Sequence, residues 1–248
     1  MSGPRRLVVV DIDDTLYLER DYVRSGFAAV GAWARDELGL DGLGERAWAA
    51  FEAGVRRTIF DEVLAAAGRE PTPELVGQMV EVYRDHRPDI ALLDDARAWL
   101  DAVPDDVVVA AVTDGPLASQ RAKAEALDLR RWVDTIVFTA ELGPGMGKPH
   151  PAAFERLERD LGLAGPCCAY VADNPAKDFV APRRLGWRTV RVRRPEGLHA
   201  GVPSGDDVED EDPHTEIGRA SCRERVEISG VAVALKNNRA GEAVTYTF

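Results

Sequence analysis

The sequence predicts a doubly wound α/β fold, in which a parallel sheet is covered by helices on both faces. Short apolar runs recur along the chain, and each is followed by turn residues and then by a pattern with helical spacing. Strands that are apolar at every position suit a parallel sheet buried on both faces. Their alternation with helices is typical of this fold class. The runs are Leu7–Val10, Val107–Val112, Ile136–Phe138, Ala169–Ala172 and Thr189–Val192.

A long insertion separates the first two predicted strands, from about Tyr17 to Ile90. A direct crossover between parallel strands needs only about a dozen residues, so the surplus predicts a small helical domain over the active end of the first strand. An ornamental helical insertion is the alternative. Helical spacing supports either interpretation. It is visible at Val23, Phe27, Val30 and Ala34, and again at Leu75, Met79 and Val82.

The composition and charge of the chain limit the classes of partner and the cellular location that we expect. The chain has 248 residues and a net charge of −12, which argues against a nucleic-acid or anionic-membrane binder. No apolar run approaches the roughly 20 residues that a membrane helix needs. Three cysteines form no disulfide framework, and the first residues lack the layout of a signal peptide. We therefore predict a cytoplasmic protein without a membrane or nucleic-acid partner.

The C-terminal part of the sequence differs from the rest. Residues 201–215 include the acidic run DDVEDED, which predicts a flexible solvated segment. The stretch EIGRASCRERV that follows resembles the translation of a sequencing adapter. We therefore exclude residues 216–248 from fold reasoning as a non-native tail. A genuine C-terminal β-hairpin is the alternative, because VEISGVAVAL has the composition of a strand.

Three acidic residues follow the first predicted strand. The stretch RLVVVDIDDTLY places Asp11, Asp13 and Asp14 directly after its apolar run. A turn there would bring Asp11 and Asp13 close to one point, where one carboxylate can attack and the other can transfer a proton. A solvated surface turn is the alternative for this motif alone. We assign no chemistry to Asp14.

The second predicted strand also ends in candidate site residues. In VVVAAVTDG the strand ends at Thr113, and Asp114 follows. The Thr113 hydroxyl and the backbone N–H groups of the turn can hold a phosphoryl oxygen. Pro116 suits the first turn of the helix predicted next. The N-terminus of that helix favours an anion.

A lysine and two further acids complete the set of candidates. Lys148 lies in the loop GPGMGKPHP, where an ammonium could offset carboxylate and phosphate charge. A P-loop is excluded, because Leu142 and Pro149 stand where that motif needs glycine and serine or threonine. YVADNPAKDF ends a strand at Asp173 and places Asp178 five residues later. Carboxylates suit Mg²⁺. Each segment taken alone has a simpler interpretation. Lys148 would be a solvated loop residue, and the acidic segment would form a helix-capping turn.

The four motifs taken together resemble the haloacid dehalogenase-like hydrolase superfamily. Their order, strand–DxDxT, strand–T, loop–K and strand–D-x4-D, spans residues 6–193. The insertion after the first motif is similar to the helical cap of that family. The resemblance implies a Rossmann-like catalytic core from residues 1–16 and 91–200, with a helical cap from residues 17–90.

The resemblance also implies a role for each motif residue. Asp11 would be the nucleophile that becomes a phospho-aspartate. Asp13 would protonate the leaving oxygen and then activate water. Thr113 and Lys148 would bind the phosphoryl group and balance its charge, and we add Asp114 to the substrate-binding candidates.

A magnesium ion is the cofactor that the resemblance implies. Asp173 would bind Mg²⁺ together with Asp11 and the backbone carbonyl of Asp13, and Asp178 would support the metal. Several acids at one point repel each other, and a divalent cation relieves that repulsion.

The function expected from this resemblance is a Mg²⁺-dependent phosphatase acting on a small phosphorylated metabolite. Carbon–halogen and phosphonate hydrolases of the superfamily tend to lack an acid at the position of Asp13, so its presence favours phosphate esters. A phosphomutase with the same core motifs is the first alternative, and a non-catalytic binding protein is the second. A dinucleotide-binding protein is set aside, because G-x-G-x-x-G does not follow the first strand.

Overall fold

The chain divides into two compact units. The computed structural model describes residues 6–203, 232–234 and 245–247. One unit contains residues 6–18, 92–117 and the described residues from 128 onward. The other contains residues 19–91 and 118–127. The division into compact units does not test the predicted cap boundaries at residues 17 and 90, which stay a prediction.

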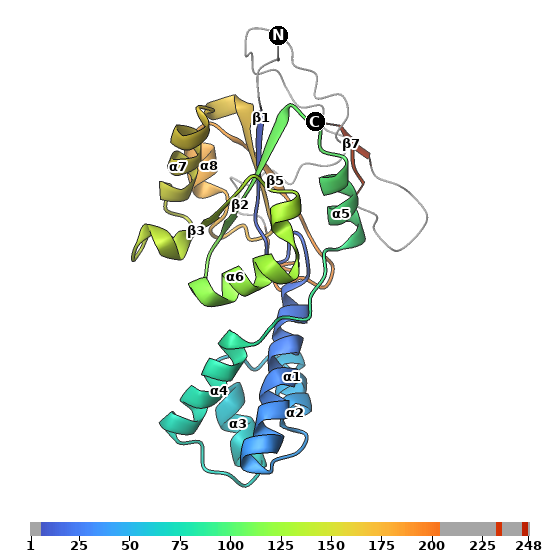
Figure 1. The fold of residues 1–248 in the computed structure, drawn as a ribbon, viewed down its shortest axis with the longest axis vertical. Helices are drawn as coiled ribbons and strands as arrows, with labels where there is room; N and C mark the ends of the chain where they lie inside the picture. Colours follow the sequence, from blue (N-terminus) through green and yellow to red (C-terminus); the bar gives the residue numbers. More distant parts are fainter. Residues whose placement is uncertain (1–5, 204–231, 235–244, 248) are drawn as a thin grey trace. The chain divides into compact units, whose positions relative to one another are not determined.

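A five-stranded parallel sheet forms the centre of the first unit (Figure 1). Its strand order is β3-β2-β1-β4-β5, and every neighbouring pair is parallel. This arrangement confirms the predicted fold class, and each predicted run falls within one residue of a strand at either end. The strands are β1 (Arg6–Val10), β2 (Val107–Thr113), β3 (Thr135–Phe138), β4 (Cys168–Ala172) and β5 (Arg188–Arg191).

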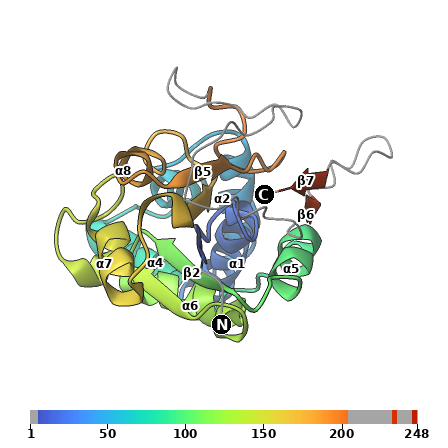
Figure 2. The same cartoon turned by 90° about the horizontal axis from the view of Figure 1, so that it is seen from above.

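Helices cover both faces of this sheet, which explains why its strands are continuously apolar. The helix α5 (Asp94–Asp101) lies on one face, whereas α7 (Ala152–Leu161) and α8 (Val180–Arg184) lie on the other (Figures 1 and 2). Six of the seven residues of β2 are buried as a result. Short 3₁₀ turns complete the unit at Leu129–Arg131, Thr139–Leu142 and Gly165–Cys167.

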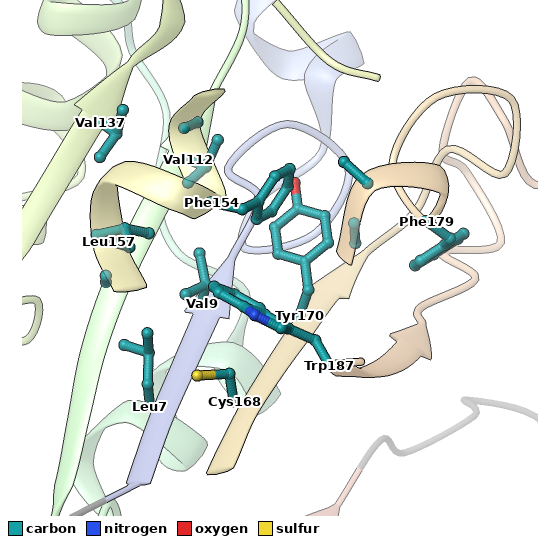
Figure 3. Close-up of a cluster of buried hydrophobic side chains, with 14 of the residues drawn as sticks. Leu7, Val9, Val112, Val137, Phe154, Leu157, Cys168, Tyr170, Phe179 and Trp187 are labelled. Carbon is teal, nitrogen blue, oxygen red and sulfur yellow. The ribbon is translucent and has the colours of Figure 1, made fainter. Parts of the chain in front are cut away.

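The core of the sheet unit includes aromatic side chains between β4 and the helices beside it. The ring of Phe154 on α7 packs edge-on against Tyr170 of β4, with 4.9 Å between centroids, and against Trp187 at 5.4 Å (Figure 3). All three side chains are buried. Smaller residues of β1 and β4, including Val9 and Cys168, fill the same cluster.

The second unit is helical, as the insertion predicts. Phe27 lies in its core, with ring contacts to Phe51, Phe60 and Tyr83. Gly44 allows two of the helices to approach closely, because a Cβ there would lie 2.5 Å from the carbonyl oxygen of Phe27. The helices are α1 (Glu19–Leu38), α2 (Leu43–Glu52), α3 (Ile59–Ala66), α4 (Pro73–Asp85) and α6 (Leu117–Ala126).

The helix α6 follows β2 in the sequence but packs within the helical unit from residue 118 onward. The Ser119 hydroxyl donates a hydrogen bond to the carbonyl of Arg84 at 3.2 Å. The ammonium of Lys123 lies 4.2 Å from the ring centroid of Tyr22. The helix α6 directly follows the predicted phosphate-binding strand in the sequence. It nevertheless belongs to the same compact unit as the inserted helices.

Two short strands in the C-terminal part of the chain pair antiparallel. These are β6 (Ala232–Ala234) and β7 (Thr245–Thr247). The other residues beyond 203 lie outside the described residues. The predicted acidic segment at 201–215 and non-native tail at 216–248 therefore stay predictions. Within the described residues, none of the helices combines the length and the apolar character that a membrane crossing requires.

Candidate active site

The turn after β1 holds the first pair of predicted catalytic acids. The backbone N–H of Asp11 donates to the carbonyl of Val171 on β4 at 2.9 Å, which ties Asp11 to the end of the sheet. Leu16 N–H donates to the carbonyl of Ile12 at 3.0 Å and closes the turn. The hydroxyl of Tyr17 donates to the carboxylate of Asp13. Asp11 is buried and Asp13 is half-buried, so this is not a solvated surface turn.

Asp14 has a structural contact that sequence reasoning missed. Its backbone has a φ of 49°, in the left-handed region that aspartate and asparagine tolerate better than most residues. Its buried carboxylate accepts a hydrogen bond from Leu198 N–H at 2.6 Å. Leu198 lies 184 residues further along the chain, so no local pattern could indicate this contact.

The chain from the last residue of β5 onward supports both acidic turns. The guanidinium of Arg194 donates to the carbonyl of Thr15 at 2.6 Å. Arg191 donates to the carbonyl of Asp173 at 3.2 Å. The amide of Asn174 lies 3.1 Å from Nε2 of His199. This segment therefore braces the turns that follow β1 and β4.

Lys148 is buried among the predicted site residues. Its side chain is 0% exposed, which excludes the solvated loop lysine. Its Nζ lies 2.9 Å from Oδ1 of Asp11 and 2.8 Å from Oδ1 of Asp178. Burial by itself would lower the pKa of Lys148, but the charges of Asp11 and Asp178 outweigh it and raise the pKa above its ordinary value. Lys148 therefore stays protonated and partly offsets the two carboxylates.

Asp114 links the loop of Lys148 to the end of β2. Its carboxylate accepts hydrogen bonds from the Thr139 hydroxyl at 2.7 Å and from the backbone N–H of Lys148 at 3.2 Å. It also pairs with Nζ of Lys177 at 3.3 Å. Burial alone would raise the pKa of Asp114, but Lys148 and the Thr139 hydrogen bond lower it overall. Thr113 precedes it and is buried, and the substrate-binding roles of Thr113 and Asp114 stay predictions.

Three carboxylates meet at the ends of β1 and β4 in an arrangement that fits a divalent cation. One oxygen each from Asp11, Asp173 and Asp178 lies within 4.8 Å of the others, and all three residues are buried. Within the described part of the chain, Oδ2 of Asp173 is buried without a hydrogen-bond partner. Hard oxygen donors around a buried carboxylate oxygen without a hydrogen bond suit a divalent cation. The carboxylate of Asp13 is not part of this group, and its predicted contribution is through the backbone carbonyl.

Electrostatics also favours a cation at this point. Burial, together with the charges of Asp11, Asp178 and Asp14, raises the pKa of Asp173 to about 8. Burial raises the pKa of Asp11 to about 6, against the opposing effect of Lys148. The ammonium of Lys148 therefore does not fully compensate the carboxylates. A divalent cation would restore their ionised forms.

Mg²⁺ is expected to stabilise the protein more at pH 8 than at pH 5.5. Asp173 ionises near its ordinary pKa of 3.8 when unfolded but near 8 when folded, so without metal the free energy of unfolding falls as pH rises between these values. Saturating Mg²⁺ reverses this loss, and we expect Tm to rise by about 5–10 °C at pH 8 and less than half as much at pH 5.5. Thermal unfolding with Mg²⁺ or EDTA measures both shifts.

Asp173→Asn is the matched control for this measurement. The amide is neutral at both pH values and a weaker ligand, so its Tm should depend less on pH and respond little to Mg²⁺. An equal Mg²⁺ shift in the wild type and in this variant would contradict a metal site at Asp173.

Most predicted site residues lie at one edge of the sheet, and Tyr170 and Lys177 join them. Tyr170 accepts a hydrogen bond from Nζ of Lys148 at 2.9 Å. Its one signal in the sequence is a hydroxyl within an otherwise apolar strand. Lys177 lies next to Asp178. It occupies one of the unspecified positions between the two acids of the D-x4-D motif, so the motif assigns it no role. The sequence motifs therefore do not identify Tyr170 or Lys177 as candidate site residues.

Comparison with known protein families gives a match over most of the chain. Residues 5–186 match the haloacid dehalogenase-like hydrolases. The chain belongs to this family. The motifs quoted from the sequence lie largely within the matched range, and membership accounts for the parallel sheet with an inserted helical unit.

Two relatives of known description are phosphatases. A phosphoserine phosphatase from Thermus thermophilus is 33% identical over 172 residues, which cover 68% of this chain and 66% of that protein. A glyceraldehyde 3-phosphate phosphatase from Methanocaldococcus jannaschii is 24% identical over 196 residues, covering 75% and 83% respectively. The chain thus spans about two thirds of the length of the first relative.

A solved structure supports the fold. The predicted phosphoglycolate phosphatase from Haemophilus somnus superposes with a TM-score of 0.56 at 17% identity, over 82% of this chain and 91% of that one. At this identity, the likeness concerns the fold of these hydrolases alone.

Proposed function

We propose that this hydrolase is a phosphatase that uses Mg²⁺ and a phospho-aspartate on Asp11 to hydrolyse a small phosphorylated metabolite. The observation that carries the proposal is the buried cluster at the sheet edge. It combines an acid held by a buried lysine with two further carboxylates that could hold a cation. Two phosphatases among the relatives favour phosphate esters as substrates.

The first chemical step would transfer the phosphoryl group to Asp11. A carboxylate oxygen of Asp11 attacks phosphorus, and the bond from phosphorus to the ester oxygen breaks. Asp13 donates a proton to the leaving oxygen. The hydrogen bond from Tyr17 fixes the orientation of the Asp13 carboxylate for this transfer. Lys148 offsets negative charge beside Asp11, which matters because phosphoryl transfer depends mainly on positioning and electrostatic stabilisation.

The second step would release inorganic phosphate. Asp13, now ionised, takes a proton from water, and the resulting oxygen attacks phosphorus while the bond to Asp11 breaks. Asp11, Asp173 and Asp178, with the backbone carbonyl of Asp13, would hold the cation, which would supply positive charge to offset the phosphate oxygens. The cycle ends with Asp11 as a carboxylate and Asp13 protonated again.

A panel of phosphate monoesters tests this proposal. We expect at least one small metabolite, with phosphoserine and glyceraldehyde 3-phosphate included, to reach kcat/KM of about 10⁴ M⁻¹s⁻¹ or more with Mg²⁺. EDTA should abolish the release of inorganic phosphate. A flat, weak profile over the whole panel would contradict a metabolic phosphatase. Transfer of the phosphoryl group to a second hydroxyl without phosphate release would identify a phosphomutase instead.

A further inference from the structure

Three oxygens surround the ammonium of Lys148, and one of them, the hydroxyl of Tyr170, has no role in the proposed chemistry. Its Nζ lies 2.9 Å from Asp11, 2.8 Å from Asp178 and 2.9 Å from the hydroxyl of Tyr170. A lysine ammonium has three N–H donors and no acceptor, so Tyr170 is the acceptor in its pair.

Tyr170 is held rigidly at this place. It lies on the interior strand β4, between β1 and β5, in register with Val9 of β1, and its side chain is buried. Phe154 packs edge-on against its ring (Figure 3). Because sheet and ring packing both constrain it, Tyr170 holds its hydroxyl at a fixed point.

A neutral acceptor suits this position better than another acid would. Burial raises the pKa of Tyr170 well above its ordinary value, so the phenol keeps its proton. It can therefore hold the ammonium without cancelling its charge, whereas a further carboxylate would add to the repulsion among the three acids already there. The contact to Tyr170 is also the one whose acceptor the proposed reaction leaves unchanged, since Asp11 would be phosphorylated and Asp178 would face the cation.

We propose that Tyr170 is a positioning residue, whose hydroxyl holds the ammonium of Lys148 where it contacts Asp11 and a bound phosphoryl group. This inference rests on the proposed phosphatase function. An aromatic ring alone would fill the core equally well, so the role belongs to the hydroxyl.

Tyr170→Phe tests the hydroxyl directly, because it keeps the ring. A hydrogen bond to a charged group corresponds to roughly tenfold or more in an equilibrium or rate constant. We expect kcat for a phosphate ester to fall about tenfold, with KM changed less than threefold. Phe154→Leu is the matched control, since it loosens the same ring but keeps the hydroxyl. It should lower Tm more than Tyr170→Phe does and lower kcat less. The reverse ranking of kcat would overturn the proposal.

A double-mutant cycle with Lys148→Met separates positioning from packing. Calorimetry with inorganic phosphate and Mg²⁺ provides a readout that needs no turnover. Tyr170→Phe should weaken phosphate binding about fivefold in the wild type but less than twofold beside Lys148→Met. An equal factor in both backgrounds, or no effect in either, would overturn the inference. If the wild type binds phosphate but hydrolyses no ester, the phosphatase proposal fails while the cycle still reports on Tyr170.

Discussion

Asp11→Asn is expected to lower kcat/KM for phosphate-ester hydrolysis by at least about 10³-fold, because the amide cannot form the covalent phosphoryl intermediate. The change is nearly isosteric and removes one charge from a crowded acidic cluster, so the folded protein should not lose stability. Steady-state release of inorganic phosphate with Mg²⁺ measures the effect, and thermal unfolding verifies that the variant is folded.

Asp14→Asn is the matched control for this prediction. It removes a buried negative charge from the same turn, and asparagine tolerates the left-handed backbone of that position. We expect less than about a tenfold loss of kcat/KM. Equal losses of kcat/KM in Asp11→Asn and Asp14→Asn would mean that activity depends on the negative charge of the turn. They would contradict a nucleophilic role of Asp11.

Lys148→Met is expected to have the largest combined effect on activity and stability. It leaves Asp11 and Asp178 buried without their shared cation. Loss of one partner of a buried ion pair costs about 3–5 kcal/mol of unfolding free energy. Loss of a preorganised charge at the phosphoryl site lowers kcat/KM by about 10²–10³-fold. Urea unfolding in EDTA at pH 7.5 and steady-state kinetics with Mg²⁺ measure the two effects.

The destabilisation by Lys148→Met should shrink as the pH is lowered. The pKa of Asp11 is about 6 in the folded protein, with Lys148 acting to lower it, so removing the lysine moves that pKa further upward. Repulsion from ionised Asp11 is present above its folded pKa and is lost as pH falls through it. The difference in unfolding free energy between variant and wild type should therefore be smaller at pH 5 than at pH 7.5.

Lys177→Met is the matched lysine control. Its side chain is 35% exposed, and its ion pair with Asp114 is longer, at 3.3 Å. Exposed pairs contribute about 0–1 kcal/mol, so this variant should lose little stability at any pH. If Lys148→Met were no less stable than Lys177→Met at pH 7.5, the buried ion-pair account would be wrong.

The sheet was predictable because its signal is local. Each strand is a short apolar run, and burial on both faces requires that pattern. The edge strand β5 shows the limit, since its four residues are all half-buried and its predicted position is shifted by one residue. The membership of α6 in the helical unit was not predictable, because its contacts join Ser119 to Arg84 and Lys123 to Tyr22 across long stretches of sequence.

The candidate site was predictable where it coincides with strand ends. Asp11, Thr113 and Asp173 follow apolar runs, and parallel strands bring such ends to one edge. Lys148 lies in a loop without periodicity, and the resemblance to the family was needed to single it out. The supporting residues gave no signal of this kind. Tyr170 looks like any buried strand residue, and Asp14 acquires its contact only through the distant Leu198.

Trapping the covalent intermediate tests the central claim most directly. Asp13→Asn should slow the hydrolysis of a phospho-aspartate, while p-nitrophenyl phosphate has a leaving group that needs little protonation. After an acid quench, borohydride reduction converts an aspartyl phosphate into homoserine, which mass spectrometry can place in the sequence. The account predicts homoserine at position 11. Turnover of the ester with an unmodified Asp11, or modification at another acid, would contradict it.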